Sequence, residues 1–192
     1  MSNIIIITGK SASGKDYTQK YISKHYGYAP LCVATTRPKR PNEEDGIDYF
    51  FMTEWEFKEN IKNDKFIYHT TFNAIPKDGA EPETWYYGLL KLDVSTNSTV
   101  VVDIDHVEPI KKYYTELGHE VVTIMLDIDA ETRELRAKKR QGDSFSLDEW
   151  IRRSMDEAIC YSPQKVESIV DIRMVRNDDG MIDALMKLRF RA

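Results

Sequence analysis

The chain has 192 residues, 41% of them hydrophobic, and its 27 basic and 32 acidic residues give a net charge of −5. This length allows one domain with a substantial core and mobile sub-regions. The net negative charge excludes an overall positive field that would attract DNA, RNA or an anionic membrane. Cys32 and Cys160 lie far apart and outside any metal-binding spacing, which argues against a disulfide framework or a zinc site. We therefore expect a cytoplasmic protein, monomeric or homodimeric, with neither a nucleic-acid polymer nor a membrane as partner.

The first predicted element is a strand of four consecutive isoleucines at residues 4–7. A continuous β-branched run is typical of a strand buried on both faces of a parallel sheet, so we expect it to be central. It is too short for a signal-peptide core or a membrane span. A helix is expected over residues 16–25, where apolar side chains recur at helical spacing.

Residues 31–90 differ in composition from the rest of the chain. They are dense in Thr, Tyr, Phe, Pro and Gly and contain short strand-like pieces at 49–51 and 66–68. The pattern predicts that residues 31–90 form a small mixed or β-rich insertion, in a core formed by residues 1–30 and 91–192. A second substrate could bind to this insertion. The most loop-like stretch is 74–83.

The second half of the chain alternates between strand and helix patterns. Apolar runs at 100–102 and 121–126 predict strands, and a helix is expected between them over 108–117. This alternation indicates βαβ units, hence an α/β fold with a parallel sheet. The remaining expected elements are helices over 130–140, 147–161 and 181–190 and a strand over 168–175.

A phosphate-binding motif follows the first strand. Gly9, Gly14 and Lys15 match G-x-x-x-x-G-K between a predicted strand and a predicted helix. In such a loop the backbone N–H groups surround phosphate oxygens, the lysine reaches the β- and γ-phosphates, and the helix N-terminus adds a favourable dipole. The residues expected to bind ATP here are Gly9, Ser11, Ala12, Ser13, Gly14, Lys15 and Asp16.

Asp16 stands where this motif usually has a serine or threonine whose hydroxyl binds Mg²⁺. A carboxylate is also a hard oxygen ligand for Mg²⁺, but it repels a triphosphate when the metal is absent. We therefore expect Asp16 to be a metal ligand, and the reaction rate to depend more steeply on magnesium than it would with a serine or threonine at this position. The alternative is a helix-capping aspartate turned away from the nucleotide.

A second motif lies in the insertion. Arg37 and Arg40 are three residues apart on a proline-containing loop and can converge on one phosphate, with the Tyr49 hydroxyl completing the cage. Taken alone, the segment also fits a solvated basic turn. It closely resembles the T-T-R-x-x-R…G-x-D-Y segment of guanylate kinases, and the resemblance extends over nearly the whole chain, including the phosphate loop and residues 86–88, 102–105 and 177–179.

This resemblance implies a P-loop NTPase core, a nucleoside monophosphate-binding insertion and a helical lid at about 136–150. By similarity, the acceptor's phosphate would be held by Arg37, Arg40, Tyr49 and Tyr87, and Tyr68 would stand at the position that contacts the base. Asp103 and Asp105 would line the floor between the two nucleotides, with Asp103 as a second metal ligand. Arg136, Arg140 and Arg153 match the lid arginines, although Arg152 competes with Arg153 for that place, and Asn177 would contact ATP. Without a role in binding, the two aspartates would be a polar pair where a strand ends and a loop begins, and the arginines would belong to an exposed amphipathic helix.

The chain departs from the family pattern at the base-reading positions. Tyr68 replaces a glutamate that accepts from both donors of guanine, Leu89 replaces a serine or threonine, and Val33 replaces a serine on the phosphate side. Glu81 or Glu83, in a connection longer than usual, could supply the missing carboxylate. The phosphate contacts are retained while two base contacts change.

The sequence thus predicts a guanylate kinase-like enzyme that transfers the γ-phosphoryl group of ATP, with Mg²⁺, to a nucleoside monophosphate, GMP or dGMP in the first place. Another base remains open, because the G-K-D ending of the phosphate loop also resembles some bacteriophage deoxynucleotide kinases. Two other readings are a catalytically silent protein-binding module and a ribose-phosphate kinase. The chain retains Lys15 and the lid arginines, which such binding modules commonly lose, and this argues against the module. The intact T-T-R-x-x-R segment argues against the ribose-phosphate kinase.

Overall fold

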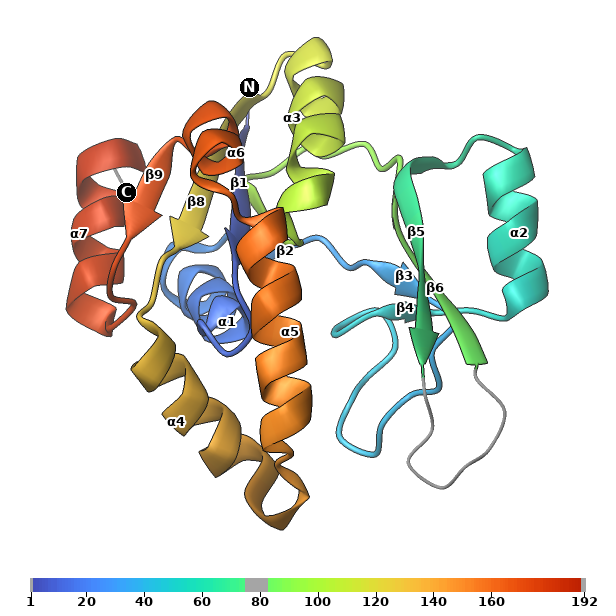
Figure 1. Cartoon of the computed structure of the whole chain (residues 1–192). Helices are drawn as coiled ribbons and strands as arrows, with labels where there is room; N and C mark the ends of the chain where they lie inside the picture. The colour runs from blue at the N-terminus through green and yellow to red at the C-terminus, as the bar shows by residue number, and fades with distance from the viewer. Residues whose placement is uncertain (1, 75–82, 191–192) are drawn as a thin grey trace. The chain divides into compact units, whose positions relative to one another are not determined.

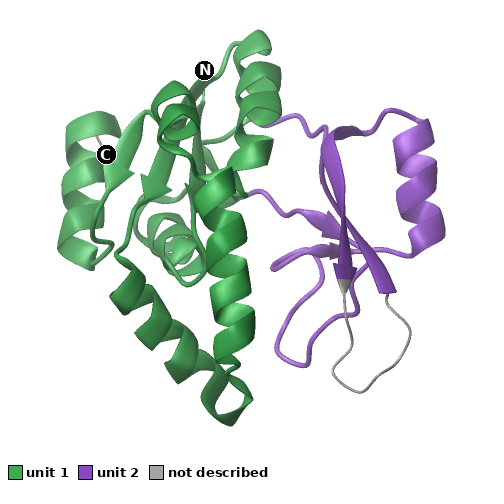
Figure 2. Ribbon diagram, viewed as in Figure 1, with its two compact units in different colours: residues 1–30, 95–192 green, residues 31–94 purple. Residues whose placement is uncertain are grey.

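The computed structural model describes residues 2–74 and 83–190 (Figure 1). The chain divides into two compact units, Met1–Pro30 with Ser95–Ala192 and Leu31–Val94 (Figure 2). The strands are β1 (Asn3–Gly9), β2 (Ala29–Pro30), β3 (Ala34–Thr35), β4 (Phe50–Phe51), β5 (Phe66–Ala74), β6 (Glu83–Leu90), β7 (Ser98–Val101), β8 (Glu120–Leu126) and β9 (Ile172–Met174). The helices are α1 (Lys15–Tyr26), α2 (Glu54–Lys62), α3 (Val107–Glu116), α4 (Ala130–Gln141), α5 (Leu147–Cys160), α6 (Pro163–Ile169) and α7 (Asp179–Phe190), with short 3₁₀ helices η1 (Ile104–His106) and η2 (Gly142–Ser144).

The first unit is built on a five-stranded parallel sheet of order β2-β7-β1-β8-β9. The isoleucine strand is central, as predicted: Ile6 lies between Val100 of β7 and Thr123 of β8. All four isoleucines are 0% exposed, because helices cover both faces of the sheet. The predicted α/β fold is confirmed.

Opposite faces of this sheet pack against different helices. Ile5, Ile7 and Ile124 share a buried cluster with Ile22 of α1 and Ile182 of α7. On the other side, α3 contacts β1 and β8 and is itself buried along one face. Because the strands are parallel, their carboxyl ends meet at one edge, where ligands bind in sheets of this kind. The turn from β1 into α1 lies at that edge.

The strand expected over 168–175 was wrong at its beginning. Ser168 and Ile169 belong to helix α6, and β9 starts only at Ile172. Pro163 stands at the first position of α6, where its fixed φ angle and missing N–H favour a helix start. Val166 is buried one turn before the end of that helix, so helical packing outweighs strand propensity here.

The second unit is a four-stranded mixed sheet of order β4-β3-β6-β5 with α2 packed on it, as the composition predicted. β3 pairs parallel with β4 and antiparallel with β6, and β5 forms an antiparallel ribbon with β6. Phe57 of α2 stacks on Phe66 of β5 with ring centroids 4.4 Å apart. The loop-like stretch expected at 74–83 falls mostly on residues 75–82, outside the described part of the chain.

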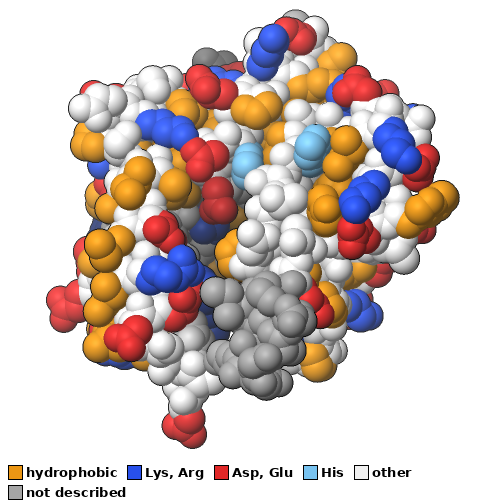
Figure 3. All heavy atoms as spheres, turned by 45° about the vertical axis from the view of Figure 1, so that its right-hand side comes forward, with side chains coloured by type: hydrophobic (Ala, Val, Ile, Leu, Met, Phe, Trp, Pro, Cys, Tyr) orange, Lys and Arg blue, Asp and Glu red, His pale blue; other side chains and the backbone are white. Residues whose placement is uncertain are grey.

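The surface carries charges of both signs. On the face drawn in Figure 3, basic and acidic side chains are interspersed. None of the helices within residues 2–74 and 83–190 has the length and apolar character needed to cross a bilayer.

Candidate functional site

The turn between β1 and α1 has the backbone of a phosphate loop. Gly14 is the N-cap of α1 with φ 95°, a left-handed conformation that glycine adopts without a steric penalty. Gly9 packs so closely that a Cβ there would lie 2.8 Å from the carbonyl oxygen of Leu126. Ala12 also has a positive φ, 61°, although it carries a Cβ. The motif's glycines are therefore required by the geometry of the turn.

Lys15 and Asp16 begin helix α1. The Lys15 ammonium lies 2.6 Å from the carbonyl oxygen of Gly9, so it folds back over the loop. The capping residue of α1 is Gly14, which leaves Asp16 in the first turn. Asp16 is exposed and lines the same pocket as Lys15, and its role as a metal ligand stays a prediction.

Arg136 and Asn177 hold the far side of the loop. Arg136 Nη1 donates to the carbonyl oxygen of Ser13 at 2.9 Å, and Nη2 donates to Asn177 Oδ1 at 3.1 Å. Asn177 is buried, and its Nδ2 donates to the carbonyl oxygen of Gly14 and to Thr18 Oγ1 at 3.4 and 3.3 Å. Both side chains were expected near ATP, and both contact the phosphate loop.

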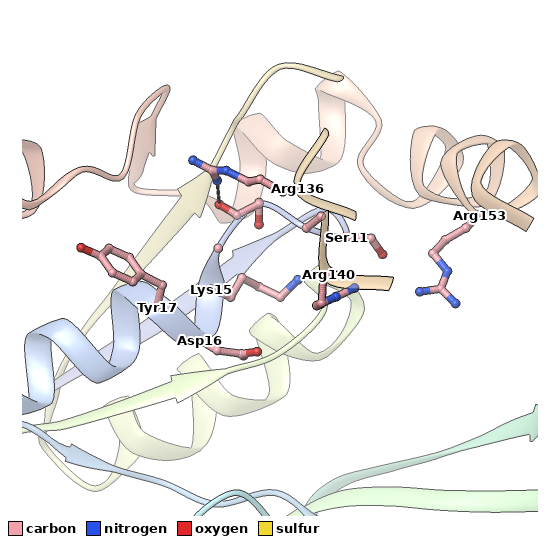
Figure 4. Close-up of a pocket in the computed structure, with 10 residues that line it drawn as sticks. Ser11, Lys15, Asp16, Tyr17, Arg136, Arg140 and Arg153 are labelled. Carbon is pink, nitrogen blue, oxygen red and sulfur yellow. Dashed lines mark hydrogen bonds between the residues drawn. The ribbon is translucent and has the colours of Figure 1, made fainter. Parts of the chain in front are cut away.

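A pocket of about 330 Å³ opens over the loop (Figure 4). The side chains of Lys15, Asp16 and Arg140 point into it, and Arg153 reaches toward it from α5. The residues lining it are Ser11, Ala12, Ser13, Gly14, Lys15, Asp16, Tyr17, Arg136, Arg140 and Arg153. Arg152, the competitor for the place of Arg153, does not line the pocket and pairs with Glu149 and Asp156 at 2.8 Å each. Arg153 lines the pocket and also lies 3.3 Å from Glu149. Four cations beside one carboxylate make a site suited to a polyanion.

Some residues that hold this loop escape prediction from the sequence. Glu157 Oε1 accepts from the Ser11 N–H at 2.6 Å, and Arg133 Nη1 donates to the Ser11 carbonyl oxygen at 3.3 Å. The phenol of Tyr161 accepts from the Gly9 N–H at 3.2 Å, and burial raises its pKa. Arg133 lies one turn before Arg136, a spacing that could have drawn attention to it. Nothing in the sequence marks Glu157.

Asp103 and Asp105 follow β7 at the carboxyl edge of the sheet. Asp103 is exposed and is the N-cap residue of η1, whereas the Asp105 carboxylate is bound by the ammonium of Lys165 on α6. Neither aspartate is among the residues that line the pocket over the phosphate loop. Their expected place between two nucleotides stays a prediction.

The described residues contain no group of three or more His, Cys, Asp or Glu side chains that could enclose a metal ion. Mg²⁺ does not need such a cage, because it binds through one or two carboxylates together with substrate phosphates and water. The Asp16 carboxylate, in the pocket that Lys15 also lines, is a hard oxygen donor of the kind that Mg²⁺ takes. The residues present therefore fit this ion.

In the second unit, Arg37 and Arg40 share one carboxylate. Arg37 is 6% exposed and its Nη2 donates to both oxygens of Glu43. Arg40 donates its backbone N–H to Glu43 at 2.9 Å, while its side chain is 70% exposed. Glu43 thus closes the loop between the two arginines.

Two tyrosines border Arg37. Its guanidinium carbon lies 5.3 Å from the ring centre of Tyr49, whose ring in turn meets that of Tyr87 edge-on at 6.4 Å. Tyr87 pairs with Thr70 across the β5–β6 ribbon, and Tyr68 pairs with Leu89. Since residues two apart share a face of a strand, Tyr68 and Tyr87 lie on the same face of the sheet.

A β-bulge produces this arrangement. The pairing register shifts between Phe66 and Tyr68, so Phe66 joins the buried cluster under α2 while Tyr68 turns to the other face. Leu89 is fully buried, and Glu83 is exposed and accepts from Trp85 Nε1 at 3.0 Å. Glu81 lies outside the described residues.

This chain is similar to known guanylate kinases. The family model for guanylate kinase matches residues 1–170. The guanylate kinase of Mesomycoplasma hyopneumoniae (strain 7448) is 38% identical over 112 residues, which cover 55% of this chain and 51% of that protein. The guanylate kinase of Bacteroides fragilis (strain YCH46) is 34% identical over 122 residues, 60% of this chain and 55% of that protein. The chain thus spans about half the length of the curated relatives it matches.

The fold has a solved counterpart. The crystal structure of guanylate kinase from Anaplasma phagocytophilum aligns with a TM-score of 0.63, covering 99% of this chain and 85% of that chain. At 18% identity, this likeness shows the fold alone. It agrees with the parallel sheet and the mixed sheet described above.

Proposed function

Because the chain belongs to the guanylate kinase family, we propose that it transfers the γ-phosphoryl group of ATP to a nucleoside monophosphate, GMP or dGMP in the first place, giving the nucleoside diphosphate and ADP. The observation that carries this proposal is the pocket over the phosphate loop. It gathers Lys15, Asp16 and three arginines around backbone N–H groups at a helix N-terminus.

The donor triphosphate binds in this pocket. Backbone N–H groups of Gly14 and Lys15 and the Lys15 ammonium hold the β- and γ-phosphates, while Arg136 and Asn177 border the loop. A transferring phosphoryl group carries charge on its equatorial oxygens. Arg140 and Arg153, already in the pocket lining, stabilise that charge without a large reorganisation.

The acceptor phosphate binds in the second unit. Arg37 and Arg40 offer guanidinium donors, and Tyr49 and Tyr87 offer hydroxyls beside Arg37. An oxygen of the acceptor phosphate forms the new bond to the γ-phosphorus as the bond to the leaving ADP oxygen breaks. The protein contributes position and charge, with no covalent enzyme intermediate.

Asp16 and Asp103 are the candidate ligands of Mg²⁺, which would supply positive charge to neutralise the β- and γ-phosphates. Asp103 and Asp105 stand at the carboxyl edge of the parallel sheet, which supports a role for that edge in binding the nucleotides. We also propose that the protein is a monomer or a homodimer and that it is located in the cytoplasm.

One assay tests the proposal. The protein is incubated with Mg·ATP and each common ribo- and deoxyribonucleoside monophosphate in turn, and ADP release is measured by coupling to NADH oxidation. We expect release far above the ATP-only background with GMP or dGMP. Release with a different monophosphate would keep the kinase and change its base. No release with any acceptor would reject the kinase and leave a binding module.

A further inference from the structure

One ion pair holds both backbone polar groups of Ser11. Glu157 accepts from the Ser11 N–H at 2.6 Å, and Arg133 donates to its carbonyl oxygen at 3.3 Å. The two side chains also bind each other, with 3.3 Å between Arg133 Nη1 and Glu157 Oε2, and are only 7% and 15% exposed. The peptide groups on both sides of Ser11 are therefore fixed from outside the loop.

The residue after this clamp is strained. Ala12 has φ 61°, a left-handed conformation in which the Cβ of an L-residue crowds the backbone. Glycine would adopt it freely. The loop is held again directly after Ala12, because Arg136 binds the Ser13 carbonyl oxygen at 2.9 Å and the Ser13 N–H donates to Lys10 at 3.2 Å. If Ala12 changed to a negative φ angle, at least one of the hydrogen bonds that hold Ser11 and Ser13 would have to break.

The clamp is itself anchored in the scaffold. Arg133 Nε donates to the Ile128 carbonyl oxygen at 3.1 Å, and its guanidinium lies 5.6 Å from the ring centre of Trp150. One turn after Glu157, the Tyr161 phenol contacts Thr8 Oγ1 at 3.0 Å and the Gly9 N–H. Helix α5 and the residue that follows it thus hold the loop at two points.

We propose that Arg133 and Glu157 are positioning residues of the donor site. They hold Ser11 so that Ala12 keeps the left-handed conformation from which the loop presents the N–H groups of Gly14 and Lys15 to the phosphates. Both side chains lie outside the lining of the pocket and act through the loop backbone. The inference rests on the proposed function, because it takes this loop to bind a nucleotide.

The test combines Glu157→Gln with Ala12→Gly in all four combinations. Mg·ADP affinity is measured by titration calorimetry, KM for ATP and kcat by the coupled assay, and folding by circular dichroism and thermal unfolding. In the Ala12 background, Glu157→Gln should weaken Mg·ADP binding by about tenfold or more, because the acceptor of the Ser11 N–H loses its charge and the ion pair with Arg133 is broken. In the Ala12→Gly background, where the glycine needs no clamp, the same substitution should weaken binding by less than about threefold.

Asp156→Asn is the matched control, since Asp156 is the neighbouring acid on α5 but is exposed and pairs with Arg152. It should leave Mg·ADP binding unchanged. A Glu157→Gln effect equal in both backgrounds, or none with Ala12, overturns the inference while the kinase proposal stands. If Glu157→Gln does not fold, Arg133→Lys replaces it with the same expected dependence on residue 12. If the unaltered protein binds no Mg·ADP, the proposed function and the inference both fail.

Discussion

Glu43 binds Arg37 through both carboxylate oxygens, at 2.7 and 3.0 Å from the same Nη2. The same carboxylate accepts the Arg40 N–H, so one acidic side chain fixes the loop that carries both arginines. A buried guanidinium with a fixed orientation loses little entropy when it binds a phosphate. The internal ion pair therefore fixes the orientation of the guanidinium that is proposed to bind the acceptor phosphate.

Glu43→Gln should lower the free energy of unfolding by about 1–3 kcal/mol near neutral pH, because it removes charge-assisted hydrogen bonds from Arg37. Burial opposes ionisation of Glu43, but hydrogen bonds from Arg37 and from the Arg40 N–H outweigh it, so its pKa lies below the ordinary value. The stability that it contributes is thus present above the ordinary glutamate pKa of about 4.3 and is lost as the pH falls through the lower folded value.

Denaturant unfolding of both proteins at several pH values checks this. The difference between wild type and Glu43→Gln should be largest near neutral pH and shrink on acidification, which separates Glu43 from other acid-sensitive groups. A difference independent of pH would mean that the Glu43 charge does not stabilise the fold.

Lys15→Met should reduce kcat by about a hundredfold or more, because it removes a preplaced cation from the charge that develops on the phosphoryl group. Acceptor binding, measured by calorimetry with the monophosphate alone, should change little, since Lys15 belongs to the other unit. Lys24→Met, an exposed change on the same helix, is the control. Loss of acceptor binding together with transfer would instead indicate a structural role for Lys15.

Asp16→Ser should flatten the dependence of the rate on Mg²⁺ concentration. The Asp16 carboxylate shares the pocket with Lys15 and would repel the triphosphate until a divalent ion neutralises it. A serine hydroxyl can still bind the ion without that repulsion. Rates of wild type and variant are compared across a magnesium titration at fixed free ATP. Superimposable profiles would exclude Asp16 as a metal ligand.

The sequence predicted those parts of the fold that local patterns determine. Four consecutive isoleucines can only be buried on both faces, and the G-x-x-x-x-G-K spacing places the loop after them. The start of β9 was mispredicted because residues 168–175 are apolar enough for a strand, while Pro163 begins a helix that continues through Ile169.

Long-range contacts of the site are harder to predict. Glu157 lies 146 residues from Ser11, and its hydrogen bond to that amide depends on how α5 packs beside the loop. Likewise, the face on which Tyr68 lies depends on a bulge, and a shift of one residue reverses every side chain of a strand. Lys15 and the arginines, in contrast, are recognisable because a motif marks them.

The departure at Tyr68 yields a prediction about base choice. Tyr68 shares a face of the mixed sheet with Tyr87. The ring of Tyr87 meets the ring of Tyr49 edge-on, and the Arg37 guanidinium lies over the Tyr49 ring. A carboxylate there would accept from both the N1–H and the amino group of guanine, which a phenol does not do with charge assistance. Tyr68→Glu should therefore raise the ratio of kcat/KM for GMP to that for AMP by about tenfold or more.

Thr71→Glu separates this effect from a general change in charge. Thr71 is exposed and lies three residues further along β5, so strand alternation points it to the opposite face from Tyr68. The same carboxylate on that face should leave the GMP-to-AMP ratio unchanged, since it cannot reach a base bound beside Tyr87. Equal shifts in both variants would show that net charge acts on the ratio, and an unchanged ratio in Tyr68→Glu would show that the base does not contact this position.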